Sequence, residues 1–350
     1  MKILIISAQN EECKGGLATW TYHYLNWLKN HDIKYDLINT DVIGNRKENL
    51  TSRRNIIEEY IRLRKIINQA KYYLNLNNKY DIVHFNTNIG NYGIFRDIYL
   101  AKLIQKKGMP IICEFHCDIP YWINNILIKK MTRSFTDKCH KALVLCENSK
   151  KYLENNCKVQ TVKIPNFIQD EYVASQKSIN KRIEKIFFTG RISNAKGCKE
   201  IYELAILFPE KQFYLAGEIS EDFQKLIKPS NVVLLGLLNH DKLFEYLDSS
   251  DLFLFPSHTE GFSLSLLESM ARGVPSIATK VGANEDMLEG KGGILVDIAD
   301  VKAMKNAIEL LENEEERKMI SEWLLNKVRN EYTVDAVMKK MIKIYESVLN

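Results

Sequence analysis

Short apolar runs alternate with longer helical patterns along the whole chain. The runs of the first half are Lys2–Ser7, Tyr35–Asn39, Asp81–Asn86, Pro110–His116, Ala142–Glu147 and Thr161–Ile164. Those of the second half are Lys185–Thr189, Gln212–Ala216, Val232–Leu235, Asp251–Phe255, Pro275–Ala278 and Gly293–Val296. Because most runs are nearly continuous rather than alternating, we expect strands covered on both faces, as in parallel sheets with right-handed crossovers.

The helical patterns between the runs predict the crossover helices. They cover Leu17–Asn30, Ile56–Leu76, Phe95–Lys107, Lys199–Phe208 and Val301–Asn313. At roughly 150 residues per domain, a chain of 350 residues is expected to form two domains. The pattern therefore predicts an α/β protein with two doubly wound, Rossmann-like domains facing each other across a cleft. We place the first domain at residues 1–166, a linker at 167–181, the second domain at 182–333 and an amphipathic helix at 334–350.

Composition narrows the class of partner and the compartment. Lys and Arg total 49 against 44 Asp and Glu, a net charge of +5 that is too small to wrap nucleic acid but suits an anionic partner or membrane surface. No apolar run approaches the roughly 18 residues that span a bilayer, and the N-terminus does not read as a signal peptide. The odd number of cysteines, 7, favours reduced thiols and a cytoplasmic protein.

One cluster of cysteines and histidines contains the residue types that bind metal ions. It contains Cys113, His116 and Cys117, followed by Cys139 and His140. This spacing fits no standard zinc pattern. We therefore expect the cysteines to pack as small hydrophobic side chains and predict no metal site.

The first of three distinctive loops follows the run Lys185–Thr189. In it, Arg191 and Lys196 are flanked by Gly190 and Gly197, just before a predicted helix. In open α/β sheets, ligands bind beyond the carboxyl ends of strands, where helix N-termini point their N–H groups outward. A guanidinium, an ammonium and a close backbone suit a diphosphate that departs with added negative charge. A solvated basic loop would show the same spacing, so spacing alone leaves both interpretations open.

The second loop follows the run Asp251–Phe255 and holds two glutamates. Glu260 precedes a predicted helix and Glu268 lies within it. Their spacing places the carboxylates on the order of 10 Å apart, too far to share one proton but suited to gripping two ends of an extended ligand. A carboxylate accepts two hydrogen bonds from a vicinal diol such as that of ribose. Two solvated glutamates beside a core helix are the alternative.

The third loop contains Gly15 and Gly16 before the first helix. It offers backbone N–H groups to an anion, but it is not G-x-G-x-x-G, which argues against a dinucleotide-dependent dehydrogenase. His116 ends the run Pro110–His116, where a polar side chain is expected to face the cleft. Both a ligand contact and a structural histidine fit that position.

Together these residues resemble the retaining glycosyltransferases of family 4, which have the GT-B fold of two facing Rossmann-like domains. The resemblance is densest in the second half, in the blocks Gly190–Gly197, Val232–Leu237, Phe255–Glu268, Met270–Pro275, Val281–Glu285 and Gly292–Val296. The first half is similar more loosely, through Gly15–Gly16, His116 and Pro165–Asn166.

The resemblance implies transfer of a sugar, with retention of its anomeric configuration, from a nucleotide-sugar donor to a glycan or lipid-linked oligosaccharide. A UDP-sugar is the favoured donor and a GDP-sugar the alternative, in the assembly of a surface polysaccharide such as O-antigen, capsule or lipopolysaccharide. The resemblance also implies that the C-terminal helix crosses back to the first domain. No metal or other cofactor is expected, because paired cations replace it.

Individual roles follow from the same resemblance. The candidate catalytic residues are His116, Arg191, Lys196 and Glu260: the cations would bind the diphosphate, Glu260 the transferred sugar, and His116 the sugar near its reacting carbon. Glu268 would bind the ribose hydroxyls. The full expected donor-binding set is Gly15, Gly16, Gly190, Leu237, Gly261, Phe262, Ser263, Leu264 and Glu268.

Two first-domain stretches, Arg53–Tyr73 and Trp122–Phe135, mix cations with apolar residues. Such helices can lie on an anionic membrane, here the cytoplasmic face of the inner membrane, or can pack with a solvated basic face. Two other functions remain as alternatives: a sugar-nucleotide epimerase of the same fold, and a non-catalytic subunit that binds sugars or partners. The ordered blocks with Arg191, Lys196, Glu260 and Glu268 disfavour both.

Overall fold

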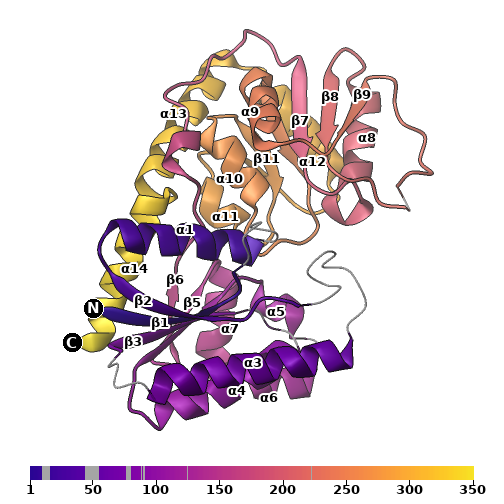
Figure 1. The fold of residues 1–350 in the computed structure, drawn as a ribbon. Coiled ribbons are helices and arrows are strands. Elements are labelled where there is room, and N and C mark those ends of the chain that lie inside the picture. The colour runs from indigo at the N-terminus through magenta and orange to yellow at the C-terminus, as the bar shows by residue number, and fades with distance from the viewer. Residues whose placement is uncertain are drawn as a thin grey trace. The chain divides into compact units, whose positions relative to one another are not determined.

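A computed structural model describes residues 1–9, 16–43, 55–75, 80–87, 89, 91–123, 125–221 and 223–350. The chain divides into two compact units (Figure 1). The N-terminal unit combines Met1–Pro165 with Val337–Asn350, and the C-terminal unit is Asn166–Ala336. Each unit has its own parallel sheet and its own hydrophobic core.

The sheet of the N-terminal unit has six parallel strands in the order β2-β1-β3-β4-β5-β6. The strands are β1 (Lys2–Ser7), β2 (Lys34–Asn39), β3 (Ile82–Thr87), β4 (Ile111–Phe115), β5 (Lys141–Val144) and β6 (Gln160–Lys163). All residues of β3 and β4 are buried, which explains their lack of polar alternation. The six predicted runs therefore appear as strands, with ends that differ by a few residues.

Helices cover both faces of this sheet (Figure 1). They are α1 (Gly16–Asn30), α3 (Ile56–Asn75), α4 (Asn91–Gln105), α5 (Ile119–Trp122), α6 (Ile126–Thr136), α7 (Glu147–Asn156) and α14 (Val334–Leu349). Alternate strand residues such as Phe85, Cys113 and Phe115 join an apolar cluster with residues of α3, α4 and α6. The opposite face meets α1 and α14, where the hydroxyls of Tyr24 and Tyr345 lie 2.7 Å apart.

The C-terminal unit repeats this plan with the parallel order β12-β11-β10-β7-β8-β9. Its strands are β7 (Lys185–Thr189), β8 (Gln212–Ala216), β9 (Val232–Gly236), β10 (Leu252–Phe255), β11 (Ser276–Thr279) and β12 (Gly293–Val296). Its helices are α8 (Cys198–Leu207), α9 (His240–Ser249), α10 (Leu264–Ala271), α11 (Asn284–Leu288), α12 (Val301–Leu310) and α13 (Glu314–Glu331), with short 3₁₀ turns at Asp170–Tyr172 and Asn194–Lys196.

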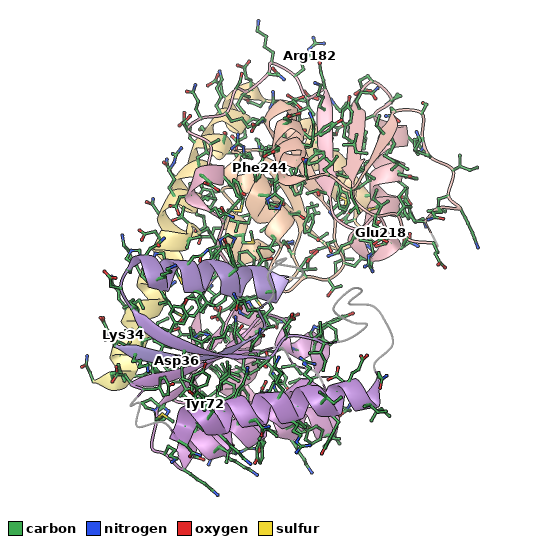
Figure 2. The ribbon with its side chains drawn as sticks, in the orientation of Figure 1. Lys34, Asp36, Tyr72, Arg182, Glu218 and Phe244 are labelled. Atoms are coloured by element: carbon green, nitrogen blue, oxygen red, sulfur yellow. The ribbon has the colours of Figure 1, made fainter. Side chains whose placement is uncertain are left out.

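The segment expected to be a linker, 167–181, packs on the C-terminal unit. The Tyr172 ring lies 4.8 Å from the ring of Phe244 on α9, and Phe244 is labelled in Figure 2. The Tyr172 carbonyl accepts a hydrogen bond from Arg272. Lys177 Nζ donates to the carbonyls of Leu247 and Asp248 at the end of α9. These contacts order the connection along one side of the unit.

None of the helices in the described parts of the chain combines the length and apolar content that a bilayer crossing needs. The six cysteines among the described residues are free thiols, five of them buried, and Cys13 lies outside the described residues. Within that part of the chain, no group of three or more His, Cys, Asp or Glu side chains could hold a metal ion.

Candidate functional site

Three loops of the C-terminal unit meet beyond the carboxyl ends of β7, β8 and β9. The Gly190 N–H donates to the Ala216 carbonyl, and the Gly217 N–H donates to the Gly236 carbonyl at 2.7 Å. A Cβ atom on Gly217 would lie 1.9 Å from the Gly190 carbonyl oxygen, and its φ of +141° is itself unfavourable for other residues. The loop after β7 can therefore lie against the loop after β8 only because residue 217 is glycine, a position that the sequence analysis missed.

The loop after β7 carries both predicted cations. Arg191 is exposed, and Lys196 is partly buried in the 3₁₀ turn Asn194–Lys196. Gly197 follows with a left-handed φ of +71°, and a Cβ there would lie 2.0 Å from the carbonyl oxygen of Pro256. This glycine lets the β7 loop pack on the β10 loop, so that Lys196 reaches the segment after β10.

The predicted sites on the β7 and β10 loops are in direct contact. Lys196 Nζ lies 2.5 Å from Glu260 Oε1, and the Glu260 side chain is only 11% exposed. One backbone bond, from the His258 N–H to the Ala195 carbonyl at 3.0 Å, ties the same two loops together. The sequence analysis expected the ammonium group and the carboxylate to bind different parts of one donor, and in the structure the two side chains contact each other.

A further side-chain contact supports these loops. His258 Nε2 lies 2.8 Å from Oε1 of Glu200, which belongs to the first turn of α8. The contact joins the β10 loop to the helix that follows Lys196. The sequence analysis missed both residues, although a histidine three residues beyond a buried strand could have been noted.

The turn before α10 is clamped by the segment after β11. Gly282 has a φ of +55°, and a Cβ there would lie 2.4 Å from the Glu260 carbonyl oxygen. The Ala283 N–H donates to the Gly261 carbonyl, and Ser263 Oγ donates to Asn284 Oδ1 at 2.6 Å. The turn 260–263 is thus held at the start of α10, where backbone N–H groups have no partner within the helix. These groups suit a ligand hydroxyl or anion.

Glu268 lies in α10, one turn from its end, as the spacing predicted. Burial raises the pKa of its carboxyl group to about 7. The remaining predicted residues of the C-terminal unit differ in exposure. Phe262 is partly buried with its ring 6.1 Å from that of Tyr332, whereas Leu237 and Leu264 are 80% and 44% exposed.

The other predicted site residues belong to the N-terminal unit. His116 follows β4, and its side chain is 7% exposed, with Nε2 3.4 Å from Glu114 Oε1. Gly16 opens α1, and a Cβ there would meet no atom within 4 Å. Gly15 lies outside the described residues. The predicted residues are therefore divided between the C-terminal unit and the N-terminal unit.

Family models account for most of the chain. The model of glycosyltransferase family 4 matches residues 14–172, and that of glycosyl transferases group 1 matches residues 183–314. The chain belongs to the family 4 glycosyltransferases. The second match covers every site loop of the C-terminal unit described above.

Curated relatives of this glycosyltransferase come from several settings. An uncharacterised 41.2 kDa protein in the cps region of Klebsiella pneumoniae is 26% identical, over 96% of this chain and 98% of the relative. The 2-deoxystreptamine N-acetyl-D-glucosaminyltransferase of Niallia circulans is 24% identical over 77% of each chain. The capsular polysaccharide biosynthesis glycosyltransferase CapM of Staphylococcus aureus is 28% identical, over 47% of this chain and 46% of the relative.

Solved structures identify the fold of the glycosyltransferase. Sucrose-phosphate synthase from Thermosynechococcus elongatus superimposes with a TM-score of 0.76 at 17% identity, covering 99% of both chains. HepE of Anabaena in complex with UDP and glucose gives 0.71 at 15% identity, covering 99% of this chain and 100% of its own. With two parallel six-stranded sheets, the protein has the GT-B fold, as the sequence predicted.

Proposed function

We propose that this glycosyltransferase is a retaining hexosyltransferase that uses a nucleotide-sugar, with UDP-sugars favoured over GDP-sugars. The acceptor is a glycan or lipid-linked oligosaccharide of a surface polysaccharide. The contact between Lys196 and Glu260 carries the proposal, because it sets the cation proposed to bind the diphosphate beside the carboxylate proposed to bind the sugar. The UDP and glucose in the HepE complex and the capsular role of CapM support the donor and the pathway class.

The chemistry of the proposed reaction follows from these charges. The bond between the sugar's anomeric carbon and the diphosphate oxygen breaks, and a bond from the acceptor oxygen forms on the same face. The acceptor proton passes to the departing phosphate oxygen. Lys196 has three N–H donors and donates one of them to Glu260, so two remain for the diphosphate. The exposed Arg191 also has donors for the diphosphate. Both stabilise the negative charge that grows on the leaving group.

A donor panel tests the proposal. The purified chain is incubated with UDP- and GDP-sugars, and NMR reports the anomeric configuration of the transferred or hydrolysed sugar. We expect release of UDP from one UDP-sugar with an initial product that retains configuration. An inverted product would contradict the mechanism, a changed sugar still attached to UDP would identify an epimerase, and binding without turnover would identify a non-catalytic subunit.

The pH dependence of donor use follows from Glu268. Burial raises its pKa to about 7, so the carboxylate that accepts ribose hydroxyls is depleted as the pH falls below 7. We expect kcat/KM for the donor to fall about tenfold per pH unit on the acid side. Glu268→Gln should lower kcat/KM and remove this acid limb. An acid limb of the same midpoint in Glu268→Gln would assign the titration to another group.

We propose that the reaction needs no metal ion, because Arg191, Lys196 and the start of α8 supply positive charge where the diphosphate is expected. The turnover rate in excess EDTA should therefore lie within about twofold of the rate with added Mg²⁺. Loss of activity in EDTA that Mg²⁺ restores would contradict this expectation.

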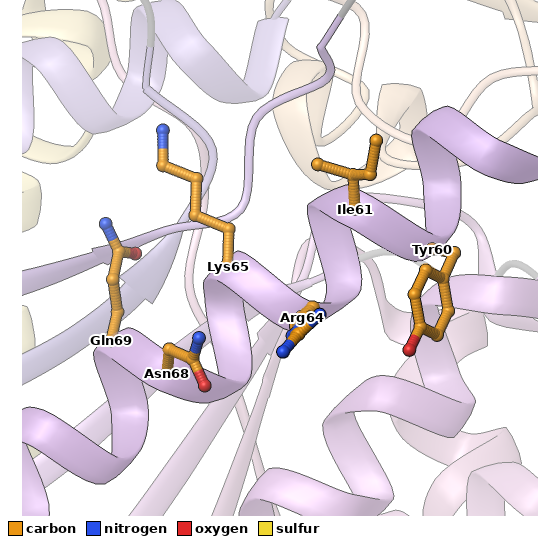
Figure 3. Close-up of a pocket in the computed structure, with 6 residues that line it drawn as sticks. All are labelled: Tyr60, Ile61, Arg64, Lys65, Asn68 and Gln69. Atoms are coloured by element: carbon orange, nitrogen blue, oxygen red, sulfur yellow. The ribbon is translucent and has the colours of Figure 1, made fainter.

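We also propose that the N-terminal unit contacts an anionic membrane on the cytoplasmic side. On α3, Tyr60, Ile61, Arg64 and Lys65, with Asn68 and Gln69, line an open pocket (Figure 3). Tyr60 and Ile61 are 63% and 53% exposed. On α6, Ile126 and Leu127 are 73% and 59% exposed beside the exposed Lys129 and Lys130. Apolar groups mixed with cations are the composition that binds at a lipid interface.

Vesicle sedimentation tests this contact. Neutralising both cations in Lys129→Gln/Lys130→Gln should weaken binding to anionic vesicles by about 30-fold, at roughly 1 kcal/mol per charge. Lys106→Gln/Lys107→Gln, another exposed adjacent pair in the same unit, is the matched control and should bind as the natural chain does. Equal binding to anionic and zwitterionic vesicles would refute the electrostatic contact.

A further inference from the structure

A fully buried carboxylate joins two imidazoles in the N-terminal unit. Glu114 on β4 has no exposed surface. Its Oε2 atom lies 3.4 Å from His84 Nε2, and its Oε1 atom lies 3.4 Å from His116 Nε2. His116 is the predicted sugar contact, whereas Glu114 and His84 have no part in the function derived so far.

Strand geometry explains how these residues meet. Glu114 pairs with Asn86 in the register of β4 and β3, so His84, two residues before Asn86, faces the same side of the sheet. That side is covered by α1 and α14. The Trp20 ring of α1 lies edge-on to His116 at 5.1 Å and stacks near His84 at 6.1 Å. The group is therefore enclosed by protein.

A run of hydrogen bonds continues from His84 to the two tyrosines. Tyr345 Oη on α14 lies 2.6 Å from His84 Nδ1, and Tyr24 Oη lies 2.7 Å from Tyr345 Oη. Burial raises the pKa of both hydroxyls, so both remain protonated and able to donate. A proton on Nε2 of His84, the ring nitrogen that faces Glu114, makes Nδ1 the acceptor for the Tyr345 hydroxyl and Tyr345 the acceptor for the Tyr24 hydroxyl.

The negative charge of Glu114 also determines which ring nitrogen of His116 carries a proton. A buried carboxylate is costly without compensating donors, and it can only accept hydrogen bonds. Among the described residues, the groups within ion-pair distance of Glu114 are the imidazoles of His84 and His116. Both Nε2 atoms must therefore carry a proton. Nδ1 of a neutral His116 then has a lone pair, the form that accepts a hydrogen bond from a sugar hydroxyl.

We propose that Glu114 is a positioning residue that holds His116 in its Nε2–H tautomer and so presents Nδ1 as the acceptor for a hydroxyl of the donor sugar. The inference rests on the sugar contact proposed for His116. The titratable groups around the pair are His84 from β3, Tyr24 from α1 and Tyr345 from α14. The neighbouring Asp118 bonds instead to Ser149.

The natural chain provides the first test without any substitution at residue 114. In the full chain labelled with ¹⁵N-histidine, long-range ¹H–¹⁵N spectra distinguish protonated from unprotonated ring nitrogens, and His84→Gln and His116→Gln assign the signals. At mildly alkaline pH we expect Nε2–H and an unprotonated Nδ1 for both residues. A His116 signal with Nδ1–H and a bare Nε2 would overturn the inference.

Glu114→Gln provides the second test, because a carboxamide has one acceptor oxygen where the carboxylate has two. One imidazole can keep its Nε2–H facing that oxygen, but the other now faces an NH₂ group. Since Tyr345 holds His84 in place, we expect His116 to switch toward Nδ1–H. The donor kcat should fall about 10- to 100-fold with little change in KM, because the imidazole is still present but wrongly protonated. Glu154→Gln, an exposed glutamate on α7, is the matched control and should behave as the natural chain.

The double variant separates this inference from the proposed function. If Glu114 acts through His116, His116→Ala and His116→Ala/Glu114→Gln should have the same kcat. A further loss in the double variant, or a Glu114→Gln kcat equal to that of Glu154→Gln, would overturn the inference. Full turnover in His116→Ala would instead refute the proposed sugar contact, and the tautomer spectra would then decide alone whether Glu114 holds His116. If Glu114→Gln does not fold, the spectrum of the natural chain decides.

Discussion

Replacing Lys196 with alanine is expected to lower kcat for the donor by about 10²–10³-fold, the usual cost of losing one preorganised donor to a developing anion. The substitution also leaves the carboxylate of Glu260, only 11% exposed, without its ammonium partner. Because the negative charge on the diphosphate grows as the sugar departs, the loss should fall on kcat more than on KM. Steady-state UDP release, with the donor that the panel identifies, measures both constants.

Lys302→Ala is the control for this prediction. Lys302 is an exposed lysine of α12, so its removal changes the net charge equally and leaves the Lys196–Glu260 pair intact. Its kcat should stay within about twofold of the natural chain, as expected for a surface charge. Equal activity of Lys196→Ala and Lys302→Ala would remove Lys196 from the mechanism.

The strands could be predicted because a parallel strand buried on both faces is apolar nearly throughout. All four residues of β10 are buried, for example, and the sequence shows a continuous run there. Helix α13, in contrast, was not predicted. Two of its buried positions are Arg317, which donates to the Leu311 and Asn180 carbonyls, and Lys327, which pairs with Glu289. Long cationic side chains at buried positions interrupt the apolar pattern from which a helix is predicted.

The charged residues of the candidate site could be identified from the sequence, but the contacts between them could not. Motif spacing placed Lys196 and Glu260 at the ends of two strands, but 64 residues separate them, and their pairing depends on how Gly197 packs on Pro256. The cluster around Glu114 left a fainter signal, a lone glutamate inside an apolar strand. His116 lies only two residues further along the chain, but His84 comes from β3 and Tyr345 from α14, so no local pattern could identify the whole cluster.

Gly217→Ala is expected to destabilise the C-terminal unit by about 2–4 kcal/mol, within the range for severe backbone strain and overpacking. The new Cβ would lie 1.9 Å from the Gly190 carbonyl oxygen, and because that atom is backbone, the loops after β7 and β8 must separate. Arg191 follows Gly190 directly, so kcat should also fall at least tenfold, as misplacement by about 1 Å can cost 10²-fold. Urea unfolding and donor turnover measure the two effects.

Gly290→Ala isolates the steric cause. Gly290 also has a left-handed φ of +66°, but a Cβ there would meet no atom within 4 Å. Its cost should therefore be only the conformational one, about 1–2 kcal/mol, with turnover unchanged. If the two alanine variants unfold at the same urea concentration and turn over equally, the contact between the β7 and β8 loops does not position Arg191. If Gly217→Ala alone loses turnover, a single glycine hydrogen controls how closely these loops approach and where the guanidinium meets the diphosphate.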